Sequence, residues 1–339
     1  MGYNIFLPLG DEFTSSSRKK VTAMIRNFLP CALLTATLAL TLPANATLLT
    51  RTFVSSAGSD SNPCTITQPC TSFAHAYSLT APDGIIAALD PGKYGPLTIT
   101  GPITINGNGW AAITAPAGGS GITINGGVNG LVALTGLEID GADASSNGID
   151  FETNGGSATL VVDKCVVQNV VKGIFVQPNG TLNNFAITNT MVSNNGTGIY
   201  LSPANTTNVH GVIDHVIATG GSDGINLDAR FSSGVTIIAV SNTIVGNNNN
   251  YGIVDSTGNV ANTTLSIDNV SVVGNFNIGI VVTGPATVLL GRSVVSGNGI
   301  GVENNTSANT FYTYKDNRIN LNGSMDFAGT PLNTTFTPQ

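Results

Sequence analysis

The chain has 339 residues, of which 9% are charged, and its formal net charge is −7. Residues 1–46 hold 4 of the 12 basic and 2 of the 19 acidic residues, so the remainder carries 8 against 17, a net of −9. A chain this acidic has no basic stripe to neutralise phosphates, which argues against nucleic acid as a partner.

Residues 1–46 have the composition of a cleaved export signal. Four basic residues, the last of them Arg26, precede an apolar run over residues 28–42, and Ala44-Asn45-Ala46 follows as a small-x-small cleavage site. The run is about 15 residues long, whereas a membrane span needs about 20. We therefore predict cleavage before Thr47, secretion to the periplasm or the extracellular medium, and no integral membrane association.

Two cysteines follow the leader closely. Cys64 and Cys70 flank a short loop that contains Pro69. In an exported chain this spacing predicts a disulfide that closes the loop. Cys165 lies instead in the apolar run 161–167, which predicts a small buried residue with a free thiol.

Residues 71–79 predict a short amphipathic helix, because Thr71 and Ser72 are followed by Phe73, Ala76 and Leu79. The repeats beyond it need a cover, since the first coil of a stacked structure exposes apolar side chains and unpaired backbone. We assign residues 47–94 to this N-terminal cap and the first coil.

From residue 121 onward the dipeptide Gly-Ile occurs eight times, at starting positions separated by 20–28 residues. This spacing is typical of stacked repeats. Apolar residues alternate within each repeat, which indicates two or three short strands per coil. The prediction is an all-β fold, a single-stranded right-handed parallel β-helix over residues 95–325 with a tail at 326–339. Such a solenoid forms one domain, and we expect a monomer.

The repeated isoleucines are expected to form one buried ladder, from Ile122 to Ile300. Asp255 occupies an inward position of the same strands. We expect the strand to bulge there, because burial of an unpaired carboxylate is costly; burial in the protonated form is the alternative.

The turns between strands carry a phrase of their own, an apolar residue three positions before an Asn or Gly. Examples are Asn169, Asn194 and Asn275. Asn and Gly tolerate left-handed backbone angles, and stacked Asn side chains bond their copies in neighbouring coils. These residues are therefore predicted to be scaffold.

Five segments near the start of the mature chain resemble a known family. They are Asn62-Pro63-Cys64, Pro69-Cys70-Thr71-Ser72-Phe73, Asp83-Gly84-Ile85-Ile86, Gly92-Lys93-Tyr94 and Ile103-Thr104-Ile105-Asn106-Gly107. In this order they resemble the entry to exported bacterial right-handed β-helix repeat proteins of the pectate-lyase-like superfamily. The resemblance implies the fold and no particular activity, because that superfamily includes lyases, hydrolases and adhesins.

The catalytic motifs of that superfamily are not matched. Family polygalacturonases carry an Asp-Asp pair, which this chain lacks. Ile213-Asp214-His215 resembles a segment of family pectate lyases. However, Asp214 and His215 fill the turn position that other coils give to Ser241-Asn242, so repeat filler is the preferred interpretation.

Outward positions on the Gly-Ile strands are candidates for ligand binding, because alternation exposes them. Phe175 and Tyr200 would stack one coil apart, and Gln177, Asn226 and Asp228 would supply polar groups. Such a platform suits the apolar face of a sugar ring. The alternative, weighed equally, is that a neighbouring loop covers the two rings.

Carboxylates on this face are the weak catalytic candidates. Asp150 and Glu152 lie two apart on one strand, about 7 Å between Cα atoms and within the range of paired glycosidase carboxylates. Glu152 and Asp228 would be about 14 Å apart, which is too far. Arg230 is a candidate base or charge clamp, or simply the salt-bridge partner of Asp228.

Glu138, Asp140 and Asp143 add acidic groups nearby. They are weak candidates for metal ligands and favour a bound Ca²⁺ as much as a raised carboxylate pKa. A solvated acidic patch is the simpler interpretation. No other cofactor is indicated.

The sequence favours an exported β-helix that binds polysaccharide or a cell-surface glycan without a recognisable complete catalytic set. A divergent polysaccharide lyase or glycoside hydrolase is one alternative. An adhesin or structural surface protein without a sugar site is the other.

Overall fold

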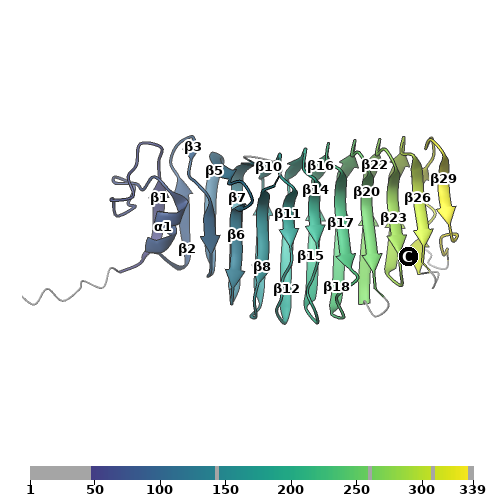
Figure 1. Ribbon diagram of the computed structural model, residues 1–339, viewed down its shortest axis with the longest axis horizontal. Coiled ribbons are helices and arrows are strands. Elements are labelled where there is room, and N and C mark those ends of the chain that lie inside the picture. Colours follow the sequence, from purple (N-terminus) through teal and green to yellow (C-terminus); the bar gives the residue numbers. More distant parts are fainter. Residues whose placement is uncertain (1–46, 142–144, 259–261, 307–309, 335–339) are drawn as a thin grey trace, which may run out of the picture. The chain divides into compact units, whose positions relative to one another are not determined.

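Successive coils of the chain stack through parallel strands. The computed structural model describes residues 47–141, 145–258, 262–306 and 310–334. Within these residues the coils contribute one strand each to a 10-stranded sheet and further strands to a 19-stranded sheet. Figure 1 shows the strands of successive coils lying side by side. The fold is a right-handed parallel β-helix, which confirms the predicted class.

The smaller sheet, sheet B, carries the Gly-Ile strands. Its members are β4 (Leu97–Ile99), β6 (Ser120–Gly126), β8 (Asn147–Thr153), β11 (Lys172–Val176), β14 (Thr197–Leu201), β17 (Asp223–Ala229), β20 (Tyr251–Thr257), β23 (Ile278–Thr283), β26 (Ile300–Asn305) and β29 (Met325–Gly329).

The larger sheet, sheet A, covers the opposite side of the core. Its members are β1 (Leu49–Val54), β2 (Thr80–Ala88), β3 (Gly92–Lys93), β5 (Ile103–Ala115), β7 (Gly130–Gly141), β9 (Ala158–Asp163), β10 (Val166–Gln168), β12 (Leu182–Thr188), β13 (Met191–Ser193), β15 (Asn208–Asp214), β16 (Ile217–Thr219), β18 (Val235–Ser241), β19 (Ile244–Gly246), β21 (Asn262–Asp268), β22 (Ser271–Val273), β24 (Thr287–Gly291), β25 (Val294–Ser296), β27 (Phe311–Thr313) and β28 (Arg318–Ile319).

The predicted isoleucine ladder holds for seven of its eight members. Residues Ile122 to Ile280 pair from coil to coil and are buried. Ile300 is the exception, because it pairs with Ile278 and is half-buried, while Val302 pairs with Ile280. Its Gly-Ile phrase follows the preceding one after 20 residues. Ile300 therefore lies two residues before the ladder position of β26, and Val302 occupies that buried position.

The turn asparagines are scaffold residues, as predicted. Asn248, Asn275, Asn298 and Asn322 form a ladder in which each Nδ2 donates to the next Oδ1 at 2.9, 2.9 and 3.0 Å. The left-handed position directly precedes this ladder, as at Asn247 with φ 56° and Gly274 with φ 67°. The sequence motif, an apolar residue three positions before an Asn or Gly, coincides with the left-handed position in some coils and with the ladder position in others. At Asn275 it coincides with the ladder residue, one position after the left-handed Gly274.

The N-terminal part also follows the prediction. Helix α1 (Phe73–Leu79) begins after Ser72, whose hydroxyl accepts a hydrogen bond from His75 N at 3.1 Å. Phe73 and Ala76 are fully buried, so α1 packs its apolar face on the core. No helix within the described ranges is both long and apolar enough to cross a membrane.

Both cysteine predictions are confirmed. Cys64 and Cys70 form a disulfide, and Cys165 is a buried free thiol. The backbone of Cys70 also pairs with β1, donating to Phe53 O at 3.0 Å and accepting from Ser55 N at 2.9 Å. The disulfide therefore fastens its loop to the first strand of sheet A.

Burial raises the pKa of the Cys165 thiol to about 11. A buried neutral thiol reacts slowly, since the thiolate is the nucleophile. Iodoacetamide at pH 8 should leave the folded protein unmodified. In denaturant without reductant, the chain that begins at Thr47 should gain one carbamidomethyl group by intact mass, and a gain of three would contradict the disulfide.

Asp255 corrects the sequence prediction. The strand does not bulge, because Asp255 pairs in register with Leu227 and Val282, and its side chain has 0% exposure. Thr257 Oγ1 donates to Asp255 Oδ1 at 2.9 Å, while Oδ2 is buried without a donor. Burial raises the pKa of Asp255 to about 7, and the Thr257 hydrogen bond lowers it less. The protonated form fits this site, since a neutral carboxyl costs less to bury than a charged one.

This shift predicts a pH-dependent stability. The folded pKa lies above the unfolded value of about 3.9, so the native state binds the proton more tightly and the contribution of Asp255 is lost as pH rises toward about 7. Asp255→Asn cannot ionise. The variant should melt close to the wild type at pH 4 and several degrees above it at pH 8 by calorimetry. A difference that stays constant with pH would contradict the buried, protonated state.

Candidate functional site

The outer face of sheet B presents its side chains in columns, because parallel pairing places equivalent residues of successive coils beside one another. One column runs from Asp150 through Phe175 and Tyr200 to Asn226. The sequence predicted this register. The candidate site, which we call the sheet B row, consists of this column and the residues around it. These are Glu152, Lys172, Gln177, Asp228, Arg230 and Phe231.

Phe175 and Tyr200 stack as expected, with ring centroids 5.3 Å apart and an interplanar angle of 19°. Phe175 is nevertheless buried, with 7% exposure, which corrects the expectation of an exposed pair. A side chain of the same strand contributes to this burial. Lys172 Nζ lies 3.5 Å from the centroid of Phe175 and 4.7 Å from that of Tyr200. Tyr200 remains half-buried and is the accessible ring of the two.

The sequence did not indicate Lys172 as a residue of the candidate site. Burial lowers the pKa of its ammonium group, and the charges of Asp150 and Glu152 oppose that shift. Among the described residues, no carboxylate lies within ion-pair distance of its Nζ. Strict alternation from the buried Ile174 predicts an inward side chain at position 172, so the sequence pattern gave no signal for this lysine.

The charges of Asp150 and Glu152 act on the ammonium group of Lys172. Burial is the largest cause that raises the pKa of Asp150 to about 7, followed by the charge of the neighbouring Glu152. Asp150 Oδ1 is buried without a hydrogen-bond partner, which favours the neutral, protonated carboxyl. Asp150 Oδ2 has long contacts with Ser120 Oγ and Asn147 Nδ2, at 3.3 and 3.4 Å. The pair can hold a proton near neutral pH.

Asp228 and Arg230 form an ion pair at the other end of the row. The guanidinium donates to both carboxylate oxygens, with Nε–Oδ1 2.8 Å and Nη2–Oδ2 2.7 Å, and these bonds hold the pKa of Asp228 below its ordinary value. Tyr200 Oη donates to Asp228 Oδ2 at 3.2 Å. Burial and the Asp228 charge raise the pKa of Tyr200. Arg230 is therefore a charge partner and not a free base.

The remaining predicted binding residues are placed differently. Gln177 is exposed, and Asn226 is half-buried with a long contact from its Nδ2 to Asp223 Oδ2 at 3.4 Å. Phe231 follows Arg230 and is 82% exposed, with the guanidinium carbon 5.7 Å from its ring centroid. The sequence reasoning missed Phe231, because it lies in the turn after the strand.

The metal candidates are separate from this row. Glu138 and Asp140 lie on β7 of sheet A, where Asp140 Oδ1 accepts from Asn169 Nδ2 at 2.6 Å. Asp143 lies outside the described residues. The Ca²⁺ hypothesis stays a prediction.

Within the described ranges, one group of three metal-capable side chains lies close together, formed by Cys64, Cys70 and His75. The disulfide uses both sulfurs of this group. The group therefore offers no thiolate to an ion.

Asp214 and His215 occupy a scaffold turn. His215 has a left-handed φ of 52°, close to 49° at Asn189 and 48° at Asn242 in the equivalent turns. Asp214 Oδ1 accepts from Ser241 Oγ at 2.6 Å and from Asn242 Nδ2 at 2.8 Å in the next coil. These contacts agree with repeat filler.

Comparison with known proteins found one family model and two similar solved structures. A family model described as a domain of unknown function (DUF4957) matches residues 88–210. No curated protein matches the chain. A crystal structure of pectate lyase Pel9A is similar at 15% identity, covering 83% of this chain and 81% of that one with a TM-score of 0.46. The native GH136 lacto-N-biosidase from Eubacterium ramulus is similar at 13% identity, covering 82% and 66% with a TM-score of 0.40.

The geometry of the row predicts unequal effects of its two rings on stability. Phe175→Ala should destabilise the protein by roughly 2 kcal/mol and lower the melting temperature by several degrees, because a buried ring and its covering contacts are lost. Tyr200→Ala should cost less, since that ring is half-buried. Equal and negligible shifts in thermal unfolding would show that Phe175 is exposed in solution.

Proposed function

We propose that the chain binds a polysaccharide along the outer face of sheet B, over β8, β11, β14 and β17. The observation that carries the proposal is Lys172, whose partly desolvated ammonium lies over the Phe175 and Tyr200 rings without an ion-pair partner among the described residues. Such a donor gains a hydrogen bond from a ligand oxygen. A sugar ring on Tyr200 would bring its hydroxyl groups within reach of that donor.

The row offers the groups that sugar recognition uses. Tyr200 and the exposed Phe231 present aromatic surface, and Gln177 and Asn226 present amides. The coil-to-coil repeat aligns these groups along the direction in which strands stack. An extended polymer could therefore contact several coils at once, which multiplies weak contacts.

The charge balance favours a neutral polysaccharide. The chain beyond residue 46 has a net charge of −9. Arg230 is already paired with Asp228, and the acidic pair Asp150 and Glu152 stands beside Lys172. A polyanion would meet repulsion from this surface.

A second candidate function is cleavage of the bound glycan by Asp150 and Glu152. The observation in its favour is the pKa of Asp150 near 7, since a carboxyl that holds its proton at neutral pH suits a general acid. The 5% exposure of Asp150 counts against it, because a substrate would have to displace covering side chains. An adhesin or structural surface protein without a sugar site is the remaining alternative.

Export is part of the same proposal. We infer a location outside the cytoplasm from the leader composition together with the Cys64–Cys70 disulfide. Disulfides persist in oxidising compartments.

The test is retention on immobilised polysaccharides, with galactan, xylan and glucomannan as neutral probes and polygalacturonate as the acidic one. Lys172→Met keeps the stem over Phe175 while removing the charge. Combined with Tyr200→Ala it should reduce binding of the retained neutral probe at least about tenfold. Reducing-end release and absorbance of unsaturated products, measured on the same samples, report cleavage.

Matched controls are Lys164→Met and Phe276→Ala, which remove an exposed lysine and an exposed aromatic ring elsewhere. Both should bind as the wild type does. Retention that survives in the double variant would reject the sheet B row. Cleavage that Glu152→Gln abolishes would replace the binding proposal with the enzymatic one.

A further inference from the structure

A second column of polar residues runs along the outer face of sheet A. It contains Asp163, Thr188, Asp214, Ser241 and Asp268, which pair in this order from coil to coil, and it ends at Gly291. Hydroxyl groups alternate with carboxylates, and Thr188 Oγ1 donates to Asp163 Oδ1 at 2.9 Å. Gly291 interrupts the column by removing the side chain.

The neighbours of Gly291 crowd the position that a side chain would take. A Cβ there would meet Asp268 Oδ1 and Tyr314 Cδ2 at 3.3 Å each, and Asp316 Oδ1 at 3.8 Å. Gly291 does not have a left-handed φ, so its backbone could accept another residue. The requirement for glycine is therefore spatial. Three side chains, one from the preceding coil and two from the following coil, converge on Gly291.

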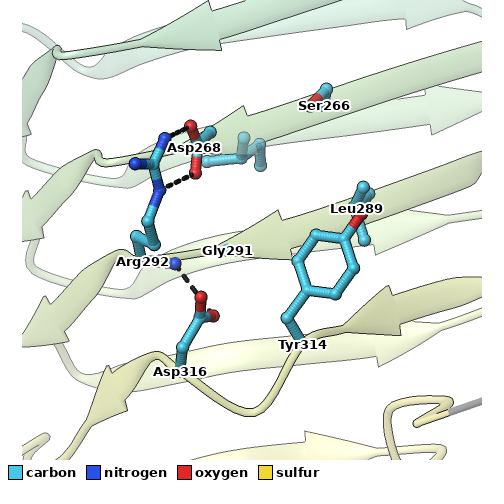
Figure 2. Close-up of a pocket in the computed structure, with 8 residues that line it drawn as sticks. Ser266, Asp268, Leu289, Gly291, Arg292, Tyr314 and Asp316 are labelled. Carbon is cyan, nitrogen blue, oxygen red and sulfur yellow. Dashed lines mark hydrogen bonds and ion pairs between the residues drawn. The ribbon is translucent and has the colours of Figure 1, made fainter. Parts of the chain in front are cut away.

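These side chains enclose a cavity of about 370 Å³, which we call the Gly291 cavity. Figure 2 shows Arg292, Asp268 and Asp316 on one side of Gly291. On the other side it shows Tyr314 and Leu289. One wall is polar and the other apolar, and a volume near the lower end of about 300–1,000 Å³ suits a small ligand.

The polar wall is held in place by its own contacts. Arg292 Nε donates to Asp268 Oδ1 at 2.8 Å, and its Nη2 donates to Oδ2. Asp316 Oδ1 accepts from the backbone N of Arg292 at 3.0 Å. Because these groups are already positioned, a ligand need not order them.

The composition of the walls selects a class of ligand. Asp268 and Asp316 outnumber the single guanidinium of Arg292, so an anionic ligand is disfavoured. A ring with one apolar face and several hydroxyl groups matches an aromatic wall opposite carboxylates. Neutral hexopyranoses have this character.

We propose that the Gly291 cavity is a second sugar site, which binds a single neutral hexopyranose unit with its ring face on Tyr314 and its hydroxyl groups on Asp316 and Arg292. It lies on the other sheet from the sheet B row and shares no residue with it. The proposal therefore does not depend on the polysaccharide site.

The test is saturation-transfer NMR and calorimetric titration of the full chain with methyl glycosides of glucose, galactose and mannose, with methyl glucuronide as the anionic probe. At least one neutral glycoside should bind. Tyr314→Ala should weaken that binding by about tenfold. Gly291→Ala should abolish it while the melting temperature changes little, because the added methyl group fills the floor of the cavity.

Phe276→Ala removes an exposed ring that does not line the Gly291 cavity, and it serves as the control with unchanged affinity. Failure of all three neutral glycosides to bind, or equal affinity for the glucuronide, would overturn the assignment. Binding lost in Tyr200→Ala but kept in Tyr314→Ala would also overturn it and leave the sheet B proposal intact. The reverse pattern would support the Gly291 cavity and would not bear on the sheet B row.

Discussion

Parallel pairing between successive coils is the constraint on which the rest of this structure depends. Because every strand hydrogen-bonds to its counterpart about 4.8 Å away, each side chain lies beside the equivalent residue of the next coil. The residues stacked in one column therefore have to be compatible with one another. The buried isoleucines satisfy this by packing alone, and the turn asparagines satisfy it by donating to one another from Asn248 to Asn322.

The same constraint explains how charges are distributed on the outer faces. Carboxylates stacked in adjacent coils would repel one another. On sheet A, Asp163, Asp214 and Asp268 are separated by the hydroxyl residues Thr188 and Ser241. Thr188 donates to Asp163 and Ser241 donates to Asp214. On sheet B, Asp150 is followed by aromatic residues and not by another acid. Two acids, Asp150 and Glu152, do meet along one strand, and burial together with the charge of Glu152 raises the pKa of Asp150 to about 7.

Both candidate sugar sites arise where a column changes character. In the sheet B row, an acidic position is succeeded by two stacked rings, and Lys172 lies over them. In the Gly291 cavity, a column of polar side chains ends in a glycine, and residues of the following coil surround the gap. A regular solenoid thus acquires local chemistry through exceptions to its repeat, while the surrounding coils hold the exceptional side chains in place.

Periodicity in the sequence determined much of this protein, including the β-helix, the inward isoleucines, the capping helix, the Cys64–Cys70 disulfide and the stacking of Phe175 on Tyr200. These depend on spacing along the chain, which the repeat makes visible. Tertiary structure decided the rest. Ile300 lies outside the buried ladder because the last Gly-Ile spacing is shorter. Asp255 is buried because pairing with both neighbouring strands holds its own strand in register. Phe175 lies beneath the side chain of Lys172. The Gly291 cavity depends on three coils at once, and no local pattern reports where side chains from different coils converge.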